Sequence, residues 1–503
     1  MRLGRLPPRA ALAVAFVSGA AAVAGFAPLG IFPLPALSLA LLLALCRAAT
    51  PRGALALGFA FGAGLFGVGA SWVYVSLHDF GTMPAALAGV ATLGFCAILS
   101  LYPAAAAWGL ALLRARPASA ALLAFPALWT LAEWLRGWVF TGFPWLATGY
   151  SQTDSPLAGF APVLGVYGVS WATALVAGLA FLIAAGEPRQ RIAGACGLAV
   201  VVAAGYALGS VSWTSPEGAP VRVSLLQGNI AQDLKFQERR YAATLETYRR
   251  LVEASDARLI VLPETAVPRF FDTVDPAYWD RLARLARAKR ADLLVGVPVR
   301  DAEGRYFNSL ISLGVSPPQI YSKSHLVPFG EFVPPGFRWI VDTVAIPLTD
   351  FSRGPERPRP LALAGQRVAP DICYEDAFGE EIARQLPEAT LLVNASNVAW
   401  FGDSLAPPQH LQMSRMRALE TGRYMLRATN TGITAVIDER GRVRARLPQF
   451  TEGALQSDAQ GFSGATPYVR WANAPLIALC ALALATAAWL ARRRRVGPAW
   501  ESR

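Results

Sequence analysis

Apolar residues fill long stretches of the first 210 positions, with few charges between them, and a further apolar stretch lies near the C-terminus. A helix needs about 20 apolar residues to cross the hydrocarbon core of a bilayer. Stretches close to that length predict eight membrane helices, at about 10–26, 29–46, 54–76, 84–113, 119–136, 157–186, 192–211 and 472–491. Buried helices of a water-soluble protein are the alternative, which so many long, uncharged stretches disfavour.

The stretch 213–470 has the mixture of charged and apolar residues of a water-soluble domain. Short apolar runs alternate in it with amphipathic helical patterns. Strands are expected at 221–226, 259–262, 293–297, 306–313, 319–322, 367–372, 390–393, 434–438 and 443–446, and helices at 238–254, 277–290, 377–386 and 410–422. Two strand pairs, 306–313 with 319–322 and 434–438 with 443–446, are typical of hairpins. The alternation predicts a layered α/β sandwich with a mixed sheet.

These patterns divide the chain into three parts. Residues 1–212 are expected to form a membrane domain of seven helices, 213–470 the water-facing domain, and 471–503 a final membrane helix with an arginine-rich tail. Residues 1–25 also fit a signal peptide, because three arginines precede an apolar run. The apolar stretch that follows at once favours a retained first helix. The Pro- and Arg-rich stretch 353–360 is expected to be a surface loop.

Charge predicts the orientation in the membrane. Alternate loops hold fourteen arginines, namely Arg2, Arg5, Arg9, Arg47, Arg52, Arg114, Arg116, Arg189, Arg191, Arg492, Arg493, Arg494, Arg495 and Arg503. With Glu187 and Glu501 they account for the whole net charge of +12. Arginine-rich loops stay cytoplasmic, so the sequence pI of about 9.8 reports topology and not nucleic-acid binding. Seven crossings precede the water-facing domain, which is therefore expected on the periplasmic face of a bacterial plasma membrane.

Of the five cysteines, Cys373 alone lies in the water-facing domain, while Cys46, Cys96, Cys196 and Cys480 fall in or beside predicted membrane helices. A domain with one cysteine has no internal disulfide, and the absence of a CxxC pair argues against a zinc site. No metal or nucleotide motif is visible, and no cofactor is expected. A small buried hydrophobic residue is the alternative role for Cys373.

Each of three predicted strands is followed by a residue with a reactive side chain. These residues are Glu264, Lys323 and Cys373. Functional sites of α/β folds gather at strand ends. A thiol, with an ordinary pKa of about 8.5, needs a base or a positive field to act as a nucleophile. Glu264 fits the role of a base that takes and returns the proton, and Lys323 fits that of a cation for a developing oxyanion. A turn after Cys373 would add backbone N–H donors, so neither His325 nor His410 is needed.

The motifs around these residues carry a family resemblance. Glu264, Lys323 and Cys373 resemble the Glu–Lys–Cys triad of the nitrilase, or carbon–nitrogen hydrolase, superfamily. Longer strings resemble the apolipoprotein N-acyltransferases, namely KSHLVPFGEFVP at 323–334, ICYE at 372–375, SNVAWFG at 396–402, QHLQMSRMRALETGR at 409–423, RATNTGITAVI at 427–437 and RGWVFTGFPWLATGYSQ at 136–152. The resemblance covers nearly the whole chain and implies a nitrilase-like αββα sandwich inserted among about eight membrane helices.

The resemblance implies an activity and roles for the triad. Members of the family move an acyl chain from a phospholipid to the α-amino group of an N-terminal diacylglyceryl-cysteine on a lipoprotein. By that likeness Cys373 takes the acyl group as a thioester, Glu264 is the general base and acid, and Lys323 stabilises the tetrahedral intermediate. The implied partners are the phospholipid donor and the lipoprotein acceptor, and a monomer is expected.

The resemblance also implies supporting residues. Glu331 and Glu375 resemble carboxylates that orient Lys323 and the backbone near Cys373, although a structural ion pair is the alternative. Tyr374 resembles a residue that lines the site, and Asn308 resembles one beside the site, although a plain hairpin-turn residue is the alternative for Asn308. Trp145 resembles a tryptophan near the route of lipid access, although an ordinary interfacial aromatic is the alternative. The last match is Phe236. In QGNIAQDLKF, Phe236 stands where the family usually has tryptophan, and so lacks the indole N–H donor.

Two other functions remain open from the residues alone. A membrane-tethered amidase shares the triad but releases the acyl group to water, and a tether needs only one helix. A transporter whose outer domain binds ligand leaves the triad without a role, and the scarcity of charge within the helices disfavours an ion path. Glu133 and Arg136 are the exception near membrane depth, where they either pair at a helix end or are functional.

Overall fold

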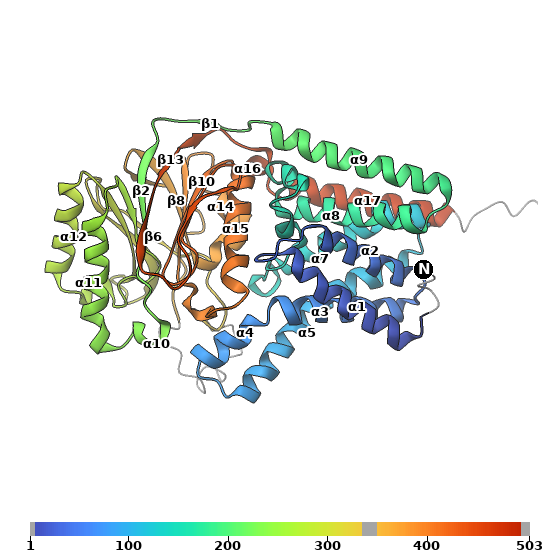
Figure 1. The fold of residues 1–503 in the computed structure, drawn as a ribbon, viewed down its shortest axis with the longest axis horizontal. Helices are drawn as coiled ribbons and strands as arrows, with labels where there is room; N and C mark the ends of the chain where they lie inside the picture. The colour runs from blue at the N-terminus through green and yellow to red at the C-terminus, as the bar shows by residue number, and fades with distance from the viewer. Residues whose placement is uncertain (1–5, 334–349, 494–503) are drawn as a thin grey trace, which may run out of the picture. The chain divides into compact units, whose positions relative to one another are not determined.

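The computed structural model describes residues 6–333 and 350–493, which form two compact units (Figure 1). The first, called here the membrane unit, contains residues 6–74, 86–211 and 471–493, and the second, the sandwich unit, contains 75–85 and 212–470. Arg2, Arg5, Arg494, Arg495, Glu501 and Arg503, together with Pro334 of the longest motif, lie outside the described residues.

Apolar helices make up the membrane unit. They are α1 (Pro8–Ala22), α2 (Pro33–Arg47), α3 (Pro51–Gly69), α5 (Ala85–Leu113), α7 (Phe125–Arg136), α8 (Ala161–Ala185), α9 (Pro188–Ser210) and α17 (Ala474–Arg493), with short α4 (Trp72–Val75) and α6 (Pro117–Ser119). Within the described ranges seven helical segments have the length and composition to cross a bilayer. The predicted count of eight fits approximately, because α2 has only 15 residues. Proline opens α1, α2 and α3, where its missing N–H costs no hydrogen bond.

Glycine allows close packing of α1 against α3. A Cβ at Gly19 would lie 1.9 Å from the carbonyl oxygen of Phe61, and one at Gly64 would lie 2.0 Å from that of Phe16. Membrane helices associate through such small residues because the bilayer supplies no hydrophobic force between them. These glycines therefore set the spacing of the two helices.

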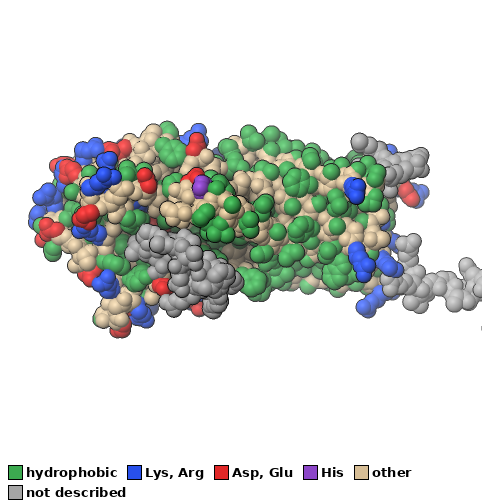
Figure 2. Space-filling model, turned by 90° about the horizontal axis from the view of Figure 1, so that it is seen from below, with side chains coloured by type: hydrophobic (Ala, Val, Ile, Leu, Met, Phe, Trp, Pro, Cys, Tyr) green, Lys and Arg blue, Asp and Glu red, His purple; other side chains and the backbone are tan. Residues whose placement is uncertain are grey.

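The arginines of the membrane unit lie at helix ends. Arg47 ends α2, and its guanidinium donates to the carbonyl of Ala115 at 2.9 Å, so the loops that hold Arg47 and Arg114 lie at the same end of the unit. Figure 2 shows Lys and Arg side chains gathered at that end on the face drawn, and hydrophobic side chains covering the rest of it. This distribution fits a unit that spans a bilayer with one arginine-rich face.

Two six-stranded sheets form the sandwich unit. The first has the order β13 (Gly453–Ala459), β2 (Val221–Gln227), β3 (Leu259–Val261), β4 (Asp292–Arg300), β5 (Tyr306–Gly314) and β6 (Ile320–Ser322). The second has the order β12 (Val443–Arg446), β11 (Ala435–Ile437), β10 (Tyr424–Thr429), β9 (Leu391–Ser396), β8 (Gln366–Ile372) and β7 (Leu361–Leu363). The trios β2–β3–β4 and β8–β9–β10 are parallel, and the outer pairs are antiparallel. A small pair, β1 (Ser215–Pro216) with β14 (Phe462–Ser463), lies apart.

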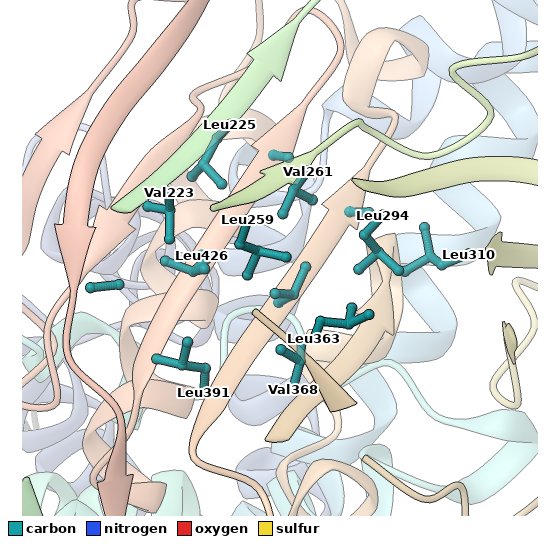
Figure 3. Close-up of a cluster of buried hydrophobic side chains, with 14 of the residues drawn as sticks. Val223, Leu225, Leu259, Val261, Leu294, Leu310, Leu363, Val368, Leu391 and Leu426 are labelled. Atoms are coloured by element: carbon teal, nitrogen blue, oxygen red, sulfur yellow. The ribbon is translucent and has the colours of Figure 1, made fainter. Parts of the chain in front are cut away.

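Helices cover the outer faces of both sheets, which confirms the predicted αββα sandwich (Figure 1). Helices α11 (Glu238–Ala254) and α12 (Pro276–Ala288) pack on the first sheet, and α14 (Gly379–Ala383) and α15 (Ala406–Thr421) on the second. Strand periodicity separates the layers, because Leu259 and Val261 point to the core between the sheets while Ile260 points to the helices. Figure 3 shows this inner core, to which both sheets contribute.

One predicted helix was wrong, and several strands of the structure were not predicted. The helix expected at 377–386 is a 3₁₀ turn, η9 (Cys373–Ala377), followed by the short α14. Strands β7, β10 and β13 were not predicted. Only Arg423 and Gly422, whose φ is +63°, separate α15 from β10, and β13 is a polar edge strand without a continuous apolar run. The sandwich unit also includes η3 (Ser76–Phe80), whose Ser76 hydroxyl donates to the carbonyl of Trp400 at 2.8 Å.

Candidate active site

Glu264 lies just beyond the end of β3, in a turn where Thr265 has a φ of +49°. Its carboxylate is buried and accepts two hydrogen bonds of 2.7 Å, one from the Asn308 amide and one from the backbone N–H of Asn397. Each donor holds a different carboxylate oxygen. The side chain is therefore fixed in one orientation by neighbours from β5 and from the loop after β9.

Lys323 follows β6 and is almost fully buried. Its ammonium lies 2.7 Å from the Glu331 carboxylate and 3.9 Å from that of Glu264. Burial acts to lower the pKa of Lys323, but the two carboxylates outweigh it, so the net pKa lies above the ordinary value. The ammonium therefore remains charged at any physiological pH.

Cys373 follows β8 directly and begins the 3₁₀ turn η9. Its φ of +54° lies in the left-handed region, which is unfavourable for a residue with a Cβ and persists only where the surroundings impose it. The residue stays partly exposed. Cys373 therefore lies at a sharp turn from strand to helix, and the first N–H groups of η9 follow it in the chain.

The environment of Cys373 keeps the thiol protonated. Burial, with the negative charge of Glu264 adding to it, raises the pKa of Cys373 to about 12, although Lys323 acts in the opposite direction. At neutral pH a pre-formed thiolate is therefore rare, and attack by the sulfur requires a base that removes the proton in the same step. The nearby negative charge of Glu264 is consistent with its role as that base, which stays a prediction.

This pKa predicts the pH dependence of alkylation. The rate at which iodoacetamide modifies Cys373 is expected to rise about tenfold per pH unit from pH 7 to 10, because only the thiolate reacts. Peptide mapping measures it separately from Cys196, the exposed cysteine of α9. An ordinary thiol levels off above a pKa of about 8.5, so a plateau for Cys373 below pH 9 would contradict the raised pKa of this thiol.

Glu375 connects the turn at Cys373 to the segment after Lys323. Its carboxylate accepts from the backbone N–H of Ile372 at 2.7 Å, from that of Ser324 at 2.8 Å and from the Tyr321 hydroxyl at 2.7 Å. Burial raises the pKa of Glu375, although Lys323 and these donors oppose the shift. Glu375 therefore holds two of the three strand ends together.

The remaining predicted site residues of the sandwich unit differ in their relation to this centre. Asn308 lies within β5, not in a turn, and its amide also donates to Glu331 at 2.8 Å, so it links two carboxylates. Tyr374 packs edge-on against Phe378 and His325. Phe236 is 38% exposed and lines a surface pocket of about 350 Å³ with Pro268, Arg269, Phe270, Thr273 and Pro298.

Sequence patterns missed several residues that contact the triad, of which two lie at Glu264. Lys235, in α10 (Gln232–Lys235), is buried and donates to the backbone carbonyl of Glu264 at 3.2 Å. Burial lowers its pKa to about 8, although the charge of Glu264 opposes the shift. Its signal was its chemistry, a lysine in a chain rich in arginine. Asn397 acts through its backbone N–H, which every residue except proline carries, so no sequence signal marks it.

Trp145 belongs to the membrane unit, where it is only 1% exposed and lies among Trp72 and Phe143. Its carbonyl accepts from Arg136 at 2.6 Å. Glu133 accepts from the backbone N–H of Thr148 at 2.9 Å, so both ionisable residues hold the loop around Trp145. The side chain is not an exposed interfacial aromatic, and its contact with substrate stays a prediction.

Within the described ranges no group of three His, Cys, Asp or Glu side chains is placed to hold a metal ion. A thiol, a fixed carboxylate, a permanently charged ammonium and turn N–H donors are the components of nucleophilic acyl transfer.

Comparison with known proteins decides the family. The model for the apolipoprotein N-acyltransferase N-terminal domain matches residues 18–179, and that for carbon–nitrogen hydrolase matches 222–468. A protein named apolipoprotein N-acyltransferase, from Nitrosomonas europaea, is 54% identical over 96% of this chain and 98% of its own length. This chain belongs to the apolipoprotein N-acyltransferase family.

Further relatives agree with this assignment. Proteins of the same name from Ralstonia nicotianae and Methylococcus capsulatus are 48% and 46% identical, over 98% and 96% of this chain and 95% and 97% of their own lengths. The resemblance predicted from the motifs is confirmed, as is the enzyme class, an acyltransferase with a catalytic domain of the carbon–nitrogen hydrolase type.

Proposed function

We propose that this protein transfers an acyl chain from a membrane phospholipid to the α-amino group of the N-terminal S-diacylglyceryl-cysteine of lipoproteins. The observation that carries the proposal is the convergence of Glu264, Lys323 and Cys373 in a member of this family, with Lys323 3.9 Å from Glu264. The apolar membrane unit supports a substrate that resides in the bilayer.

The first half-reaction forms a thioester. Glu264 takes the proton of the Cys373 thiol as the sulfur attacks the carbonyl carbon of a phospholipid ester. Lys323 and the N–H donors of η9 stabilise the negative charge on the carbonyl oxygen. The ester C–O bond then breaks, Glu264 returns the proton to the departing oxygen, and a lysophospholipid leaves.

The second half-reaction forms an amide. The α-amine of the lipoprotein attacks the thioester carbonyl, and Glu264 accepts a proton from the amine. The C–S bond breaks, the C–N bond remains, and the proton returns to the sulfur of Cys373. Since one carboxylate serves both halves, its two hydrogen bonds from Asn308 and Asn397 are expected to be retained throughout.

The proposal includes an orientation in the membrane. It puts the sandwich unit on the periplasmic side of the bacterial inner membrane, where lipoproteins are exposed after export. The arginines at one end of the membrane unit support this orientation, because basic loops remain cytoplasmic.

Mass spectrometry of lipoprotein N-termini tests the proposed function. Cells depleted of this protein are expected to accumulate lipoproteins that carry the diacylglyceryl group but have a free α-amine. Complementation with wild-type protein restores the amide, whereas the Cys373→Ala variant does not. Fully N-acylated termini in the depleted cells would exclude the transferase and leave the amidase as the remaining use of the triad.

A further inference from the structure

The backbone carbonyl of Cys373 is held from the outer face of the second sheet. It accepts from His410 Nε2 at 3.1 Å and from the Asn394 amide at 3.0 Å. His410 belongs to α15 and Asn394 to β9, and both side chains are almost fully buried. Two donors from separate elements therefore fix the peptide that leads out of the nucleophile.

A polar row across three parallel strands supports these donors. Asp371 of β8, Asn394 of β9 and Arg427 of β10 occupy matched register positions. Each comes two residues after an apolar residue that faces α14 and α15, so the row lies on the same outer face. Asn394 donates to Asp371 and accepts from Arg427 at 2.7 Å, which fixes its amide.

Asp376 completes the network from the turn η9. Its carboxylate lies 2.7 Å from His410 Nε2 and 3.1 Å from Arg427. The hydroxyl of Ser414 also donates to Asp376. Burial acts to raise the pKa of Asp376, but His410 and Arg427 outweigh it, so the carboxylate is ionised. The buried charge of Asp376 is thus matched by Arg427.

The hydrogen bonds define the role open to His410. Both partners of Nε2 are oxygen acceptors, the Cys373 carbonyl and the Asp376 carboxylate, so Nε2 carries the hydrogen. A nitrogen that donates in this way cannot accept the thiol proton. Nε2 of His410 is therefore not a second general base, and its contact is with the backbone of Cys373.

We propose that His410 and Asn394 are positioning residues that hold Cys373 in its left-handed conformation and so keep the thiol directed toward Glu264 and Lys323. A left-handed residue with a side chain persists only when its neighbours fix it, and the carbonyl of Cys373 is where they do so. The inference rests on the proposed function, which identifies the acyl donor as a phospholipid. The positioning of Cys373 itself is tested with a donor that is not a phospholipid.

The test compares two substitutions of one residue in the full-length, detergent-solubilised protein. His410→Leu removes the donor, whereas His410→Gln keeps an N–H near the position of Nε2. Acylation of Cys373 by a p-nitrophenyl fatty-acyl ester is followed as the burst of p-nitrophenolate. His410→Leu is expected to lower the burst rate about 100-fold with little change in the half-saturating ester concentration, as for a nucleophile displaced by about 1 Å. His410→Gln is expected to restore most of that rate.

A control separates positioning from loss of stability. Glu420→Gln breaks a buried 2.8 Å ion pair with Arg417 on the same helix, ten residues beyond His410. It is expected to lower the melting temperature without slowing the burst. A wild-type burst rate in His410→Leu, or equal slowing in His410→Gln and His410→Leu, would overturn the proposal.

Two further arms keep the test decisive. If His410→Leu does not fold, Asn394→Ala removes the other donor and is expected to slow the burst, and a normal burst in the folded Asn394→Ala protein would likewise overturn the proposal. Phosphatidylethanolamine vesicles are supplied in parallel as the donor. Acylation by the ester but not by the vesicles would contradict the proposed phospholipid donor while the comparison of His410 variants stands.

Discussion

Replacing Cys373 with alanine is expected to abolish the acyl-enzyme and to lower acyl transfer at least about 10⁴-fold, the scale of losing a covalent nucleophile. Without the sulfur no thioester forms, and the cation and N–H donors that remain have no intermediate to stabilise. The measurement is a hydroxylamine-sensitive acyl label on protein incubated with labelled phospholipid.

Cys196→Ala is the matched control for this prediction. Cys196 is exposed on α9 of the membrane unit, so its loss is expected to leave the label and the transfer rate unchanged. A label that persists undiminished in Cys373→Ala, or one that disappears in Cys196→Ala alone, would reject Cys373 as the nucleophile.

Glu264→Gln is expected to lower the rate of thioester formation about 10³-fold, within the range for loss of a general base. The amide has the shape of the carboxylate but cannot take a proton from a thiol whose pKa is about 12. It also accepts from only one of its two present donors, Asn308 and Asn397, and must turn its own NH₂ toward the other. Single-turnover acylation measures the rate.

Glu452→Gln is the control for removing a carboxylate. Glu452 pairs with Arg250 on the surface, and both side chains are exposed, so the substitution is expected to change neither folding nor rate. If Glu264→Gln acylates as fast as wild type, then another group deprotonates Cys373. Lys235, with its pKa of about 8, would be the first candidate.

The sequence predicted the parts of the site that depend on strand ends. Glu264, Lys323 and Cys373 each follow a predicted strand, and functional sites of α/β folds gather at strand ends, so their proximity was expected. The structure brings these ends together from two sheets, since β3 and β6 belong to the first and β8 to the second. The contacts of Asn397, His410 and Asn394 were not predictable in this way. They act through a backbone N–H or on a backbone carbonyl, and such contacts depend on the three-dimensional placement of separate elements.

Helices and strands were likewise predicted in some places and missed in others. Strong periodicity predicted β2, α11, α12 and β4 within a few residues. Strand β10 was missed because polar Arg427 and Thr429 interrupt its apolar pattern, and the structure gives a reason for them, since Arg427 belongs to the network behind Cys373. A strand that carries a buried polar row does not follow the alternation by which strands are recognised.

The most direct test of transfer through a Cys373 thioester follows one acyl chain through the enzyme. Wild-type protein is supplied with phosphatidylethanolamine that bears an isotope-labelled acyl chain. One sample is digested and mapped by mass spectrometry. A second sample is given a diacylglyceryl-cysteinyl peptide. The label is expected on the Cys373 peptide first, and then on the α-amine of the acceptor in equal amount. Label that reaches the acceptor without appearing on Cys373, or that leaves Cys373 only as free fatty acid, would contradict transfer through a Cys373 thioester.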